Sequence, residues 1–214
     1  MTKLYKSNKD ETVRMFQNDF FEAFSKVHPV VPVIVYLPVI IYFIYISFFI
    51  PRLALLSFFL LTLSGIFIWS LTEYNLHRFI FHYKPKSSFG EKLHFIFHGV
   101  HHDYPMDSRR LVMPPSVSIP LAILFYYIFR YILGKNYTPP FFAGFLIGYL
   151  FYDMMHFSIH HYNSHNKFFL FIKKHHMKHH YMDNNNGYGV SYPLWDIVYS
   201  TNFDQNDSSD NKRT

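Results

Sequence analysis

A chain of 214 residues, of which 50% are hydrophobic and 21% aromatic, has the length of one domain. It contains no cysteine, which excludes disulfides, iron–sulfur clusters and thiolate-bound haem. The net charge of +6 does not indicate a nucleic-acid partner, because the basic residues flank apolar segments, an arrangement that suits anionic lipid headgroups.

The first 28 residues are polar and charged, and they contain no apolar stretch of the kind that marks a signal peptide. Within them, residues 11–28 combine charges with phenylalanines at helical spacing, at Phe16, Phe20 and Phe24. This spacing predicts an amphipathic helix that lies on the cytosolic membrane surface. An ordinary cap packed on the rest of the domain is the alternative.

Four apolar segments follow, each about as long as the ~17–25 residues that cross the hydrocarbon core of a bilayer. They cover residues 30–50, 51–71, 116–133 and 139–156, and each contains at most one Asp, Glu, Lys or Arg. A soluble protein of this size could not bury four such segments. The predicted fold is therefore an all-α integral membrane protein with four transmembrane helices. In the last segment, the Gly144-x3-Gly148 pair predicts close helix packing.

The basic residues predict the orientation of these segments. They are concentrated before the first segment, between the second and third, and after the fourth, whereas the two short connections hold only Arg52, Arg130 and Lys135. The positive-inside rule then places both termini and the long middle loop in the cytosol. We expect residues 29–202 to form one domain, in which a cytosolic helical cap covers the membrane helices, and residues 203–214 to be a disordered tail.

Ten of the fifteen histidines fall into four groups with defined spacing, and two of these groups share the pattern His-x2-His-His. On a helix, residues three and four positions apart share a face, so such a triplet presents ligands to two neighbouring metal ions. The ten candidate ligands are His77, His82, His98, His101, His102, His156, His160, His176, His179 and His180.

The two remaining pairs differ in their spacing. His156 and His160 are one helical turn apart and point the same way. His77 and His82 are five residues apart and diverge by about 140° on an ideal α-helix. We therefore expect His77 and His82 to serve one metal each, or the helix to end between them.

Ten neutral imidazoles shared by two metal ions provide about five ligands for each ion. A five-coordinate ion keeps a position for water or dioxygen, whereas a structural zinc site is closed at four ligands. The pattern predicts a cytosolic di-metal site that activates dioxygen under the membrane surface. A non-catalytic metal-binding or transport protein is an alternative, although a transporter is expected to carry polar ligands near the middle of the bilayer.

Charged residues near the histidine groups have two interpretations each. Four carboxylates are candidates for hydrogen bonds that fix the imidazole tautomers, or else are surface or helix-capping residues: Asp153, Asp103, Asp196 and Glu73. Arg109 and Arg110 would face lipid headgroups or a docking partner, or would anchor the topology.

The four histidine groups, in this order, resemble the fatty acid hydroxylase superfamily of membrane di-metal oxygenases, from about residue 60 to residue 201. Four stretches are similar to its fatty acid 2-hydroxylase branch: EYNLHRFIFH (73–82), HGVHHDYPMDSRRLVMPP (98–115), YDMMHFSIHH (152–161) and GYGVSYPLWDIVYST (187–201). Sterol desaturases and sterol methyl oxidases share the histidine groups but not the PMDSRRLVMPP stretch, and they remain the alternative within the superfamily.

This resemblance implies that the ten histidines bind two metal ions. Iron is expected for the oxygen chemistry, and zinc could occupy the same ligands. The implied enzyme is a monooxygenase that hydroxylates carbon 2 of the acyl chain of ceramide-type sphingolipids or fatty acids, in the reaction RH + O2 + 2 e⁻ + 2 H⁺ → ROH + H2O.

The resemblance also implies the partners and the location of the enzyme. Many members carry a fused cytochrome b5 domain, for which about 28 polar residues before the first span are too few. We therefore expect a separate cytochrome b5-type electron donor and its reductase, and no nucleic-acid partner. In a eukaryotic host, the implied location is the endoplasmic reticulum membrane.

Overall fold

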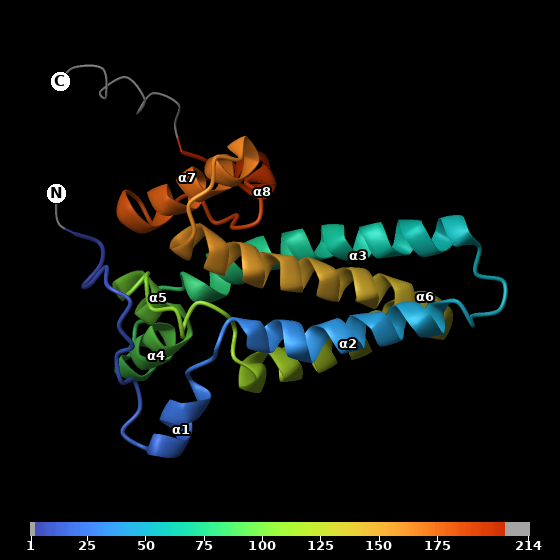
Figure 1. Ribbon diagram of the computed structural model, residues 1–214, viewed down its shortest axis with the longest axis horizontal. Coiled ribbons are helices and arrows are strands. Elements are labelled where there is room, and N and C mark those ends of the chain that lie inside the picture. The colour runs from blue at the N-terminus through green and yellow to red at the C-terminus, as the bar shows by residue number, and fades with distance from the viewer. Residues whose placement is uncertain (1–2, 204–214) are drawn as a thin grey trace.

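The computed structural model describes residues 3–203, which fold into a bundle of long helices with several short helices at one end (Figure 1). Three helices are long and apolar enough to cross a membrane: α2 (Val30–Ser47), α3 (Leu55–Asn75) with its π-helical continuation η1 (Leu76–Phe81), and α6 (Pro115–His161). The four predicted segments lie on these three helices, because the third and fourth both belong to α6.

Helix α6 is a hairpin of two helical arms that meet at Gly134. This residue has φ 73° and ψ 176°, a backbone conformation that is open almost only to glycine. The two arms pack antiparallel, with ring centroids 4.8 Å apart for Phe129 and Phe141 and 5.0 Å apart for Phe125 and Phe145. The reversal predicted between residues 133 and 139 is therefore present, but it needs only one non-helical residue.

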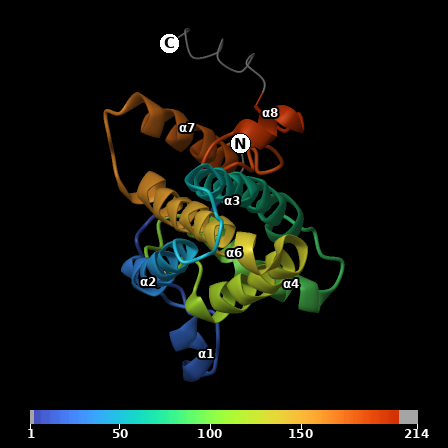
Figure 2. The same ribbon diagram turned by 90° about the vertical axis from the view of Figure 1, so that its right-hand side faces the viewer.

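Helix α6 lies between α2 and α3, as Figure 2 shows in a view along the bundle. Aromatic rings fill the core: the Trp69 ring centroid lies 5.1 Å from that of Phe145 and 5.2 Å from that of Tyr149. At Gly144, a side chain would collide with the carbonyl oxygen of Thr62 in α3. This contact confirms the predicted role of the glycine pair in helix packing.

The outer surface of the bundle is apolar. Large hydrophobic side chains that are more than half exposed occur on all three long helices, among them Ile34, Leu56, Leu63, Ile123 and Tyr131. Polar residues would occupy these positions in a bundle surrounded by water, so the surface supports a membrane protein.

The N-terminal segment contains only a short helix, α1 (Asp19–Phe24), where the sequence predicted an amphipathic helix over residues 11–28. The prediction is wrong for residues 11–18 and 25–28, which lie outside this helix. Before the helix, the Glu22 carboxylate instead accepts hydrogen bonds from the backbone N–H groups of Met15 and Phe16 at 2.9 and 3.0 Å. The segment also packs on the domain, where the Thr12 hydroxyl donates to Asp107 at 2.9 Å. The contact agrees with the alternative of a cap packed on the domain, while the phenylalanines of α1 remain exposed.

The short helices gather at one end of the bundle, around the ends of α3 and α6 (Figure 1). They are α4 (Ser88–His94), the π-helical η2 (Phe95–Gly99), α5 (Val100–Asp103), α7 (Lys167–Tyr181) and α8 (Leu194–Val198). All of the candidate metal ligands lie in or next to this end. Of the predicted tail 203–214, residues 204–214 lie outside the described residues.

Candidate metal centre

The ten predicted histidines come together in two groups of five. Within each group, one ring nitrogen of every histidine lies within 4.8 Å of those of the others. Cluster 1 consists of His77, His82, His98, His102 and His179, and cluster 2 of His101, His156, His160, His176 and His180. The other histidines of the described residues belong to neither cluster.

The two His-x2-His-His triplets contribute to both clusters. His98 and His102 belong to cluster 1, while His101, between them in the sequence, belongs to cluster 2. The triplet of α7 has the opposite distribution, with its first and third histidines in cluster 2 and only His179 in cluster 1. Residues four positions apart share a face of the helix, and the third residue is rotated away from them. Each triplet thus connects the two clusters, as the spacing predicted.

His77 and His82 both belong to cluster 1, although they are five residues apart. His77 lies in η1 and His82 is its C-cap, and in this π-helical turn the His82 N–H donates to the His77 carbonyl oxygen at 3.0 Å. In such a turn, residues five positions apart are brought onto one face. The prediction that these histidines serve different metals is wrong, because it assumed α-helical geometry. The alternative, that the helix ends between them, is confirmed, since η1 ends at Phe81 and His82 is its C-cap.

The spacing of the ring nitrogens fits a metal ion with five or six ligands. The Nε2 atom of His176 lies 3.1 Å from Nε2 of His156 and 3.0 Å from Nε2 of His160 and His180. One nitrogen carries at most one proton, so these contacts cannot all be hydrogen bonds. Two nitrogens about 2.1 Å from one ion are about 3.0 Å apart when the angle between them at the ion is 90°, and they are further apart at the wider angle of a tetrahedral site. The observed distances of 3.0–3.1 Å therefore fit the right angles of an ion with five or six ligands.

Cluster 1 has the same spacing. The Nε2 atom of His98 lies 3.0 Å from Nε2 of both His77 and His102, and Nε2 of His179 lies 2.9 Å from that of His82. The chemistry of these donors, all imidazoles, suits iron, zinc, copper or nickel. Each cluster therefore fits one ion that keeps a position free for another ligand.

Burial keeps the clustered histidines outside the membrane helices neutral at pH 7. It lowers the pKa of His179 to about 3, and the neighbouring His77 adds to this effect. Burial and the surrounding histidines likewise hold the pKa of other cluster members outside the membrane helices well below the ordinary value of 6.5: His98, His101, His102, His176 and His180. A neutral imidazole has one lone pair available, which is the form that binds a metal.

Backbone carbonyl groups fix the tautomers of two ligands in cluster 1. The Nδ1 atom of His77 lies 2.6 Å from the carbonyl oxygen of Tyr188, and Nδ1 of His179 lies 2.6 Å from that of Asn186. Since a carbonyl oxygen only accepts, each Nδ1 carries the proton and each Nε2 presents its lone pair to the cluster. The sequence did not identify these partners, because they are main-chain groups of a loop.

The four predicted carboxylates do not contact the clustered histidines directly. Asp153 accepts from the Met113 N–H and the Tyr149 hydroxyl, and Asp103 pairs with Lys6 at 2.6 Å. Asp196 accepts from the N–H groups of Tyr188 and Gly189 and also contacts His175, which belongs to neither cluster. Glu73 accepts from the N–H groups of Val190 and Ser191. The prediction that these carboxylates hydrogen-bond directly to the clustered histidines is therefore wrong. Asp196 and Glu73 hold the loop that supplies the carbonyl groups.

The basic pair next to the second histidine group is split between two environments. Arg109 is exposed, as a headgroup contact or a topology anchor requires. Arg110 is buried and donates from Nη2 to Glu22 at 2.9 Å and to the Val13 carbonyl oxygen at 2.6 Å. The interpretation of Arg110 as a residue that faces headgroups is wrong, because its guanidinium holds the N-terminal segment on the domain.

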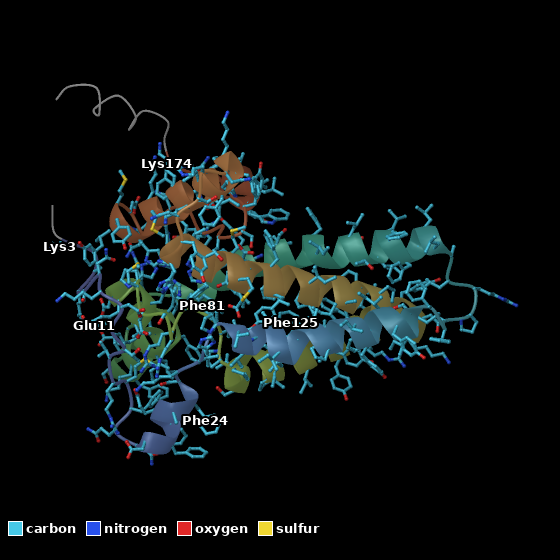
Figure 3. All side chains as sticks on the ribbon, in the orientation of Figure 1. Lys3, Glu11, Phe24, Phe81, Phe125 and Lys174 are labelled. Atoms are coloured by element: carbon cyan, nitrogen blue, oxygen red, sulfur yellow. The ribbon has the colours of Figure 1, made fainter. Side chains whose placement is uncertain are left out.

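An apolar cavity of about 670 Å³ lies against both clusters. His98 of cluster 1 and His101 and His156 of cluster 2 form part of its wall, and most of the remaining wall is hydrophobic. Phe24 on α1 and Phe81 on η1, both labelled in Figure 3, also line it. An apolar chain that entered this cavity would have its end beside the histidines.

The fold and the two clusters define a membrane protein with a candidate metal centre beside an apolar cavity. Residues 62–201 match the family model described as fatty acid hydroxylase. The chain belongs to this family, and it is thus an oxidoreductase of lipid metabolism.

Relatives with assigned activities support this membership. The chain is 39% identical over 192 residues to dihydroceramide fatty acyl 2-hydroxylase FAH1 of Arabidopsis thaliana, with 89% of this chain and 80% of the relative covered. It is 36% identical to fatty acid 2-hydroxylase of Rattus norvegicus, over 88% of this chain and 56% of the relative. The chain therefore spans little more than half the length of this mammalian relative.

A solved structure has the same fold. The structure of full-length scs7p, in which only the hydroxylase domain is visible, matches with a TM-score of 0.82 and 37% sequence identity. The match covers 88% of this chain and 71% of the other. At this identity, the agreement extends beyond the fold to the family.

Proposed function

We propose that this protein is an acyl-lipid 2-hydroxylase, which uses dioxygen and external electrons to hydroxylate carbon 2 of the acyl chain of a ceramide-type sphingolipid or a fatty acid. The names of its relatives support this choice of reaction. The observation that carries the proposal is the position of the apolar cavity, whose wall includes histidines of both clusters. An acyl chain fits such a cavity by burying its apolar surface.

The two clusters would hold one metal ion each, with the ten histidines as ligands. Iron, when bound there, would supply the activation of dioxygen, whereas redox-inert zinc would fill the same ligands without this chemistry. The residues of the chain provide neutral imidazoles, fixed tautomers and a dry environment for the reacting carbon. The cavity wall offers few polar groups to water, because aliphatic and aromatic side chains form most of it.

We further propose that the protein crosses the membrane four times. The two arms of α6 supply two of the four spans, because each arm is about as long as a bilayer core is thick and Gly134 reverses the chain between them. The excess of Lys and Arg beside the histidine end supports a cytosolic position of the metal centre and of both termini. In a eukaryotic cell, the endoplasmic reticulum is the proposed membrane.

The electrons are proposed to come from a separate cytochrome b5-type protein and its reductase. The cysteine-free chain offers no ligands for an iron–sulfur cluster or a thiolate-bound haem. Two electrons per turnover must reach the clusters from outside. His82 and His102, both in cluster 1, are only half-buried, so this cluster is the closer of the two to the surface.

The test is expression in cells that lack their own sphingolipid 2-hydroxylase but keep cytochrome b5 and its reductase. Mass spectrometry of the ceramides measures 2-hydroxylated acyl chains. His176→Ala removes the nitrogen that contacts three others in cluster 2, and it should abolish the product. His165→Ala changes an exposed histidine outside the clusters and should leave the product unchanged.

Two outcomes would contradict the proposal. The first is a wild-type chain that is present in the membrane with bound metal and yet forms no 2-hydroxylated lipid. Altered sterols in that sample would indicate a sterol desaturase or methyl oxidase instead. The second is a His176→Ala variant that still forms the product, which would separate the activity from the clusters.

A further inference from the structure

The loop of residues 186–191, here named the strap, supplies both carbonyl groups that orient ligands of cluster 1. Its Tyr188 carbonyl oxygen accepts from His77, and its Asn186 carbonyl oxygen accepts from His179. His77 and His179 come from different helices, η1 and α7. The position of the strap therefore determines how two separate elements present their imidazoles to one cluster.

Two buried carboxylates bind four successive N–H groups of the strap. Asp196, which is fully buried, accepts from the Tyr188 and Gly189 N–H groups, both at 2.8 Å. Glu73, also buried, accepts from the Val190 and Ser191 N–H groups at 2.8 and 2.7 Å. Each carboxyl group thereby orients two neighbouring N–H groups of the strap. The strap is thus held from α3 on one side and from α8 on the other.

The start of the strap is tied to the same framework. The Gly187 N–H donates to the Thr201 carbonyl oxygen at 2.8 Å, and the Thr201 hydroxyl donates to Asp196 Oδ1 at 2.8 Å. Gly187 has a φ of 73°, and a side chain there would collide with the ring of Phe203. Backbone conformation and hydrogen bonds therefore leave the strap little freedom.

Cluster 2 is built differently. Within residues 3–203, the buried Nδ1 atoms of all five of its histidines have no hydrogen-bond partner: His101, His156, His160, His176 and His180. In cluster 1 the Nδ1 atom of His102 also has none, but those of His77 and His179 are bound to the strap. Its ligands come from helices α5, α6 and α7 alone. The two clusters, similar in ligand number and spacing, thus differ in what surrounds their imidazoles.

We propose that Glu73 and Asp196 are positioning residues which, through the strap, fix the metal ion of cluster 1 without acting on that of cluster 2. The proposal rests on the metal centre proposed above. Partners of ligand imidazoles commonly change metal affinity by about 10–100-fold when they are removed. We expect a change of this size for one of the two ions only.

The geometry distinguishes the roles of charge and of hydrogen bonding at the two carboxylates. One oxygen of Glu73 accepts both strap N–H groups, while the other accepts the Ser191 hydroxyl at 2.6 Å. A glutamine can reproduce these bonds, because its amide group can donate to the hydroxyl oxygen. At Asp196, each oxygen accepts one strap N–H group, so an asparagine must turn an NH2 group toward a donor.

The experiment measures metal ions per purified full-length chain before and after exposure to a chelator. Glu73→Ala and Asp196→Asn should lose one ion, with release about 10–100-fold faster than in the wild type. Glu73→Gln should keep both ions. Asp107→Asn is the matched control, because Asp107 is also a buried carboxylate but binds Thr12 of the N-terminal segment instead of the strap. This variant should also keep both metal ions. Helical content by circular dichroism checks that each variant folds.

Combined variants identify which ion is lost. Asp196→Asn together with His179→Ala, both directed at cluster 1, should lose no more metal than His179→Ala alone. Asp196→Asn together with His180→Ala should lose both ions. The proposal would be overturned if Asp196→Asn kept both metal ions and released them at the wild-type rate. It would also be overturned if Asp196→Asn and Asp107→Asn both lost both ions.

The readout is independent of hydroxylation. A wild-type chain that holds two metal ions but forms no hydroxylated lipid would contradict the proposed function, and the metal counts would still test the strap. A wild-type chain that binds no metal would overturn both proposals.

Discussion

Arg110 and Glu22 form a buried ion pair, in which Nη2 of Arg110 lies 2.9 Å from Oε1 of Glu22 and the two side chains are 2% and 7% exposed. The residues are 88 positions apart in the sequence, and their contact fastens α1 to the loop that follows the second histidine group. Since α1 also lines the apolar cavity, the ion pair helps to shape the cavity wall.

Arg110→Met should destabilise the protein by about 3–5 kcal/mol, because Glu22 would remain buried without its guanidinium partner. Lys26, 2.7 Å from Glu22, would compensate only in part. Thermal unfolding and the rate of proteolysis within residues 11–27 measure the effect.

Arg109→Met is the matched control, since this neighbouring arginine is exposed, and it should change stability little. The double variant Glu22→Gln with Arg110→Met should be less destabilised than Arg110→Met alone, because Glu22 no longer leaves an unpaired charge buried. Asp107, 3.4 Å from Nε of Arg110, loses its partner equally in both variants. Additive losses in the double variant would show that the two side chains do not act as a pair.

Protonation of the Glu22 carboxylate at acid pH should reduce the order of the N-terminal segment. Burial alone would raise its pKa, but hydrogen bonds from Lys26, Phe16 and Met15 and the charge of Arg110 outweigh burial and lower the pKa from 4.5 to about 2. Stability from a lowered carboxylate pKa is fully present above the unfolded value and is lost as pH falls through the folded value. The segment should therefore loosen between about pH 4.5 and about pH 2.

A spin label reports this transition without interference, because the chain contains no cysteine. A nitroxide on Gln17→Cys, an exposed position next to α1, should become more mobile as the pH falls through that range. Glu22→Gln should show the mobile spectrum already at pH 7. A label whose mobility is independent of pH in both chains would rule out a role for this carboxylate.

Removal of the metal ions should lower the thermal stability of the protein. Each cluster then brings imidazole lone pairs within about 3 Å of one another without a cation between them. Free metal at about 100 times its Kd stabilises the folded state by about 2.7 kcal/mol per site, which corresponds to a shift in Tm of roughly 5–10 °C. Differential scanning calorimetry of the chelated and reloaded protein measures this shift.

The choice of metal separates structure from chemistry in the same experiment. Zinc should restore the Tm but not the hydroxylation, whereas iron should restore both. Hydroxylation by the zinc-loaded protein would contradict a redox role for the metal. A Tm that does not respond to either metal would contradict the assignment of the clusters as metal ligands.

The histidine spacing was sufficient to select the ten clustered residues, because α-helical geometry relates sequence separation to direction. The same reasoning failed at His77 and His82, where a π-helical turn changes that relation. Nothing in a local sequence pattern distinguishes the two helix types here. The packing of η1 against the strap and η2 decides it.

The tautomer-fixing groups were beyond sequence reasoning for a different reason. The sequence directs attention to side chains, and it led us to expect Asp196 and Glu73 as direct hydrogen-bond partners of the ligand imidazoles. Their actual partners are N–H groups of the strap, and the strap's carbonyl oxygens complete the connection to the histidines. Arg110 was misassigned because its partner Glu22 lies on a distant segment.

Two glycines should be intolerant of substitution for different physical reasons. Gly144→Ala places a methyl group against the Thr62 carbonyl group of α3, and separation of the two helices should cost about 1–3 kcal/mol. Gly134→Ala meets no neighbouring atom but forces a side chain into a backbone conformation that costs about 1–3 kcal/mol. Ser64→Ala, on the exposed face of α3, is the control.

Neither loss of stability should be relieved by the substitution that would seem most suited to relieve it. Thr62→Gly does not move the carbonyl group that Gly144→Ala strikes, so it should not restore stability. Gly134→Asn should remain as unstable as Gly134→Ala, because asparagine tolerates the left-handed helical region but not φ 73° with ψ 176°. A fully stable Gly134→Asn variant would show that the reversal of α6 does not need glycine.

Leu121 should influence which acyl chains are accepted. It lines both the large cavity beside the histidines and a smaller apolar pocket within the bundle, which Phe125, labelled in Figure 3, also lines. Leu121→Trp would fill space in the cavity, and Leu121→Ala would remove side-chain bulk from the wall that the two spaces share. We expect the tryptophan variant to shift the 2-hydroxylated products toward shorter chains and the alanine variant toward longer ones.

Leu124→Trp, three residues along the same helix and 54% exposed, adds the same bulk outside the cavity and should leave the chain-length distribution unchanged. The distribution is measured by mass spectrometry of the 2-hydroxylated ceramides. An identical distribution in all four chains would mean that the acyl tail does not occupy this cavity, whereas a shift in the Leu124 variant would trace the effect to the bilayer-facing surface instead.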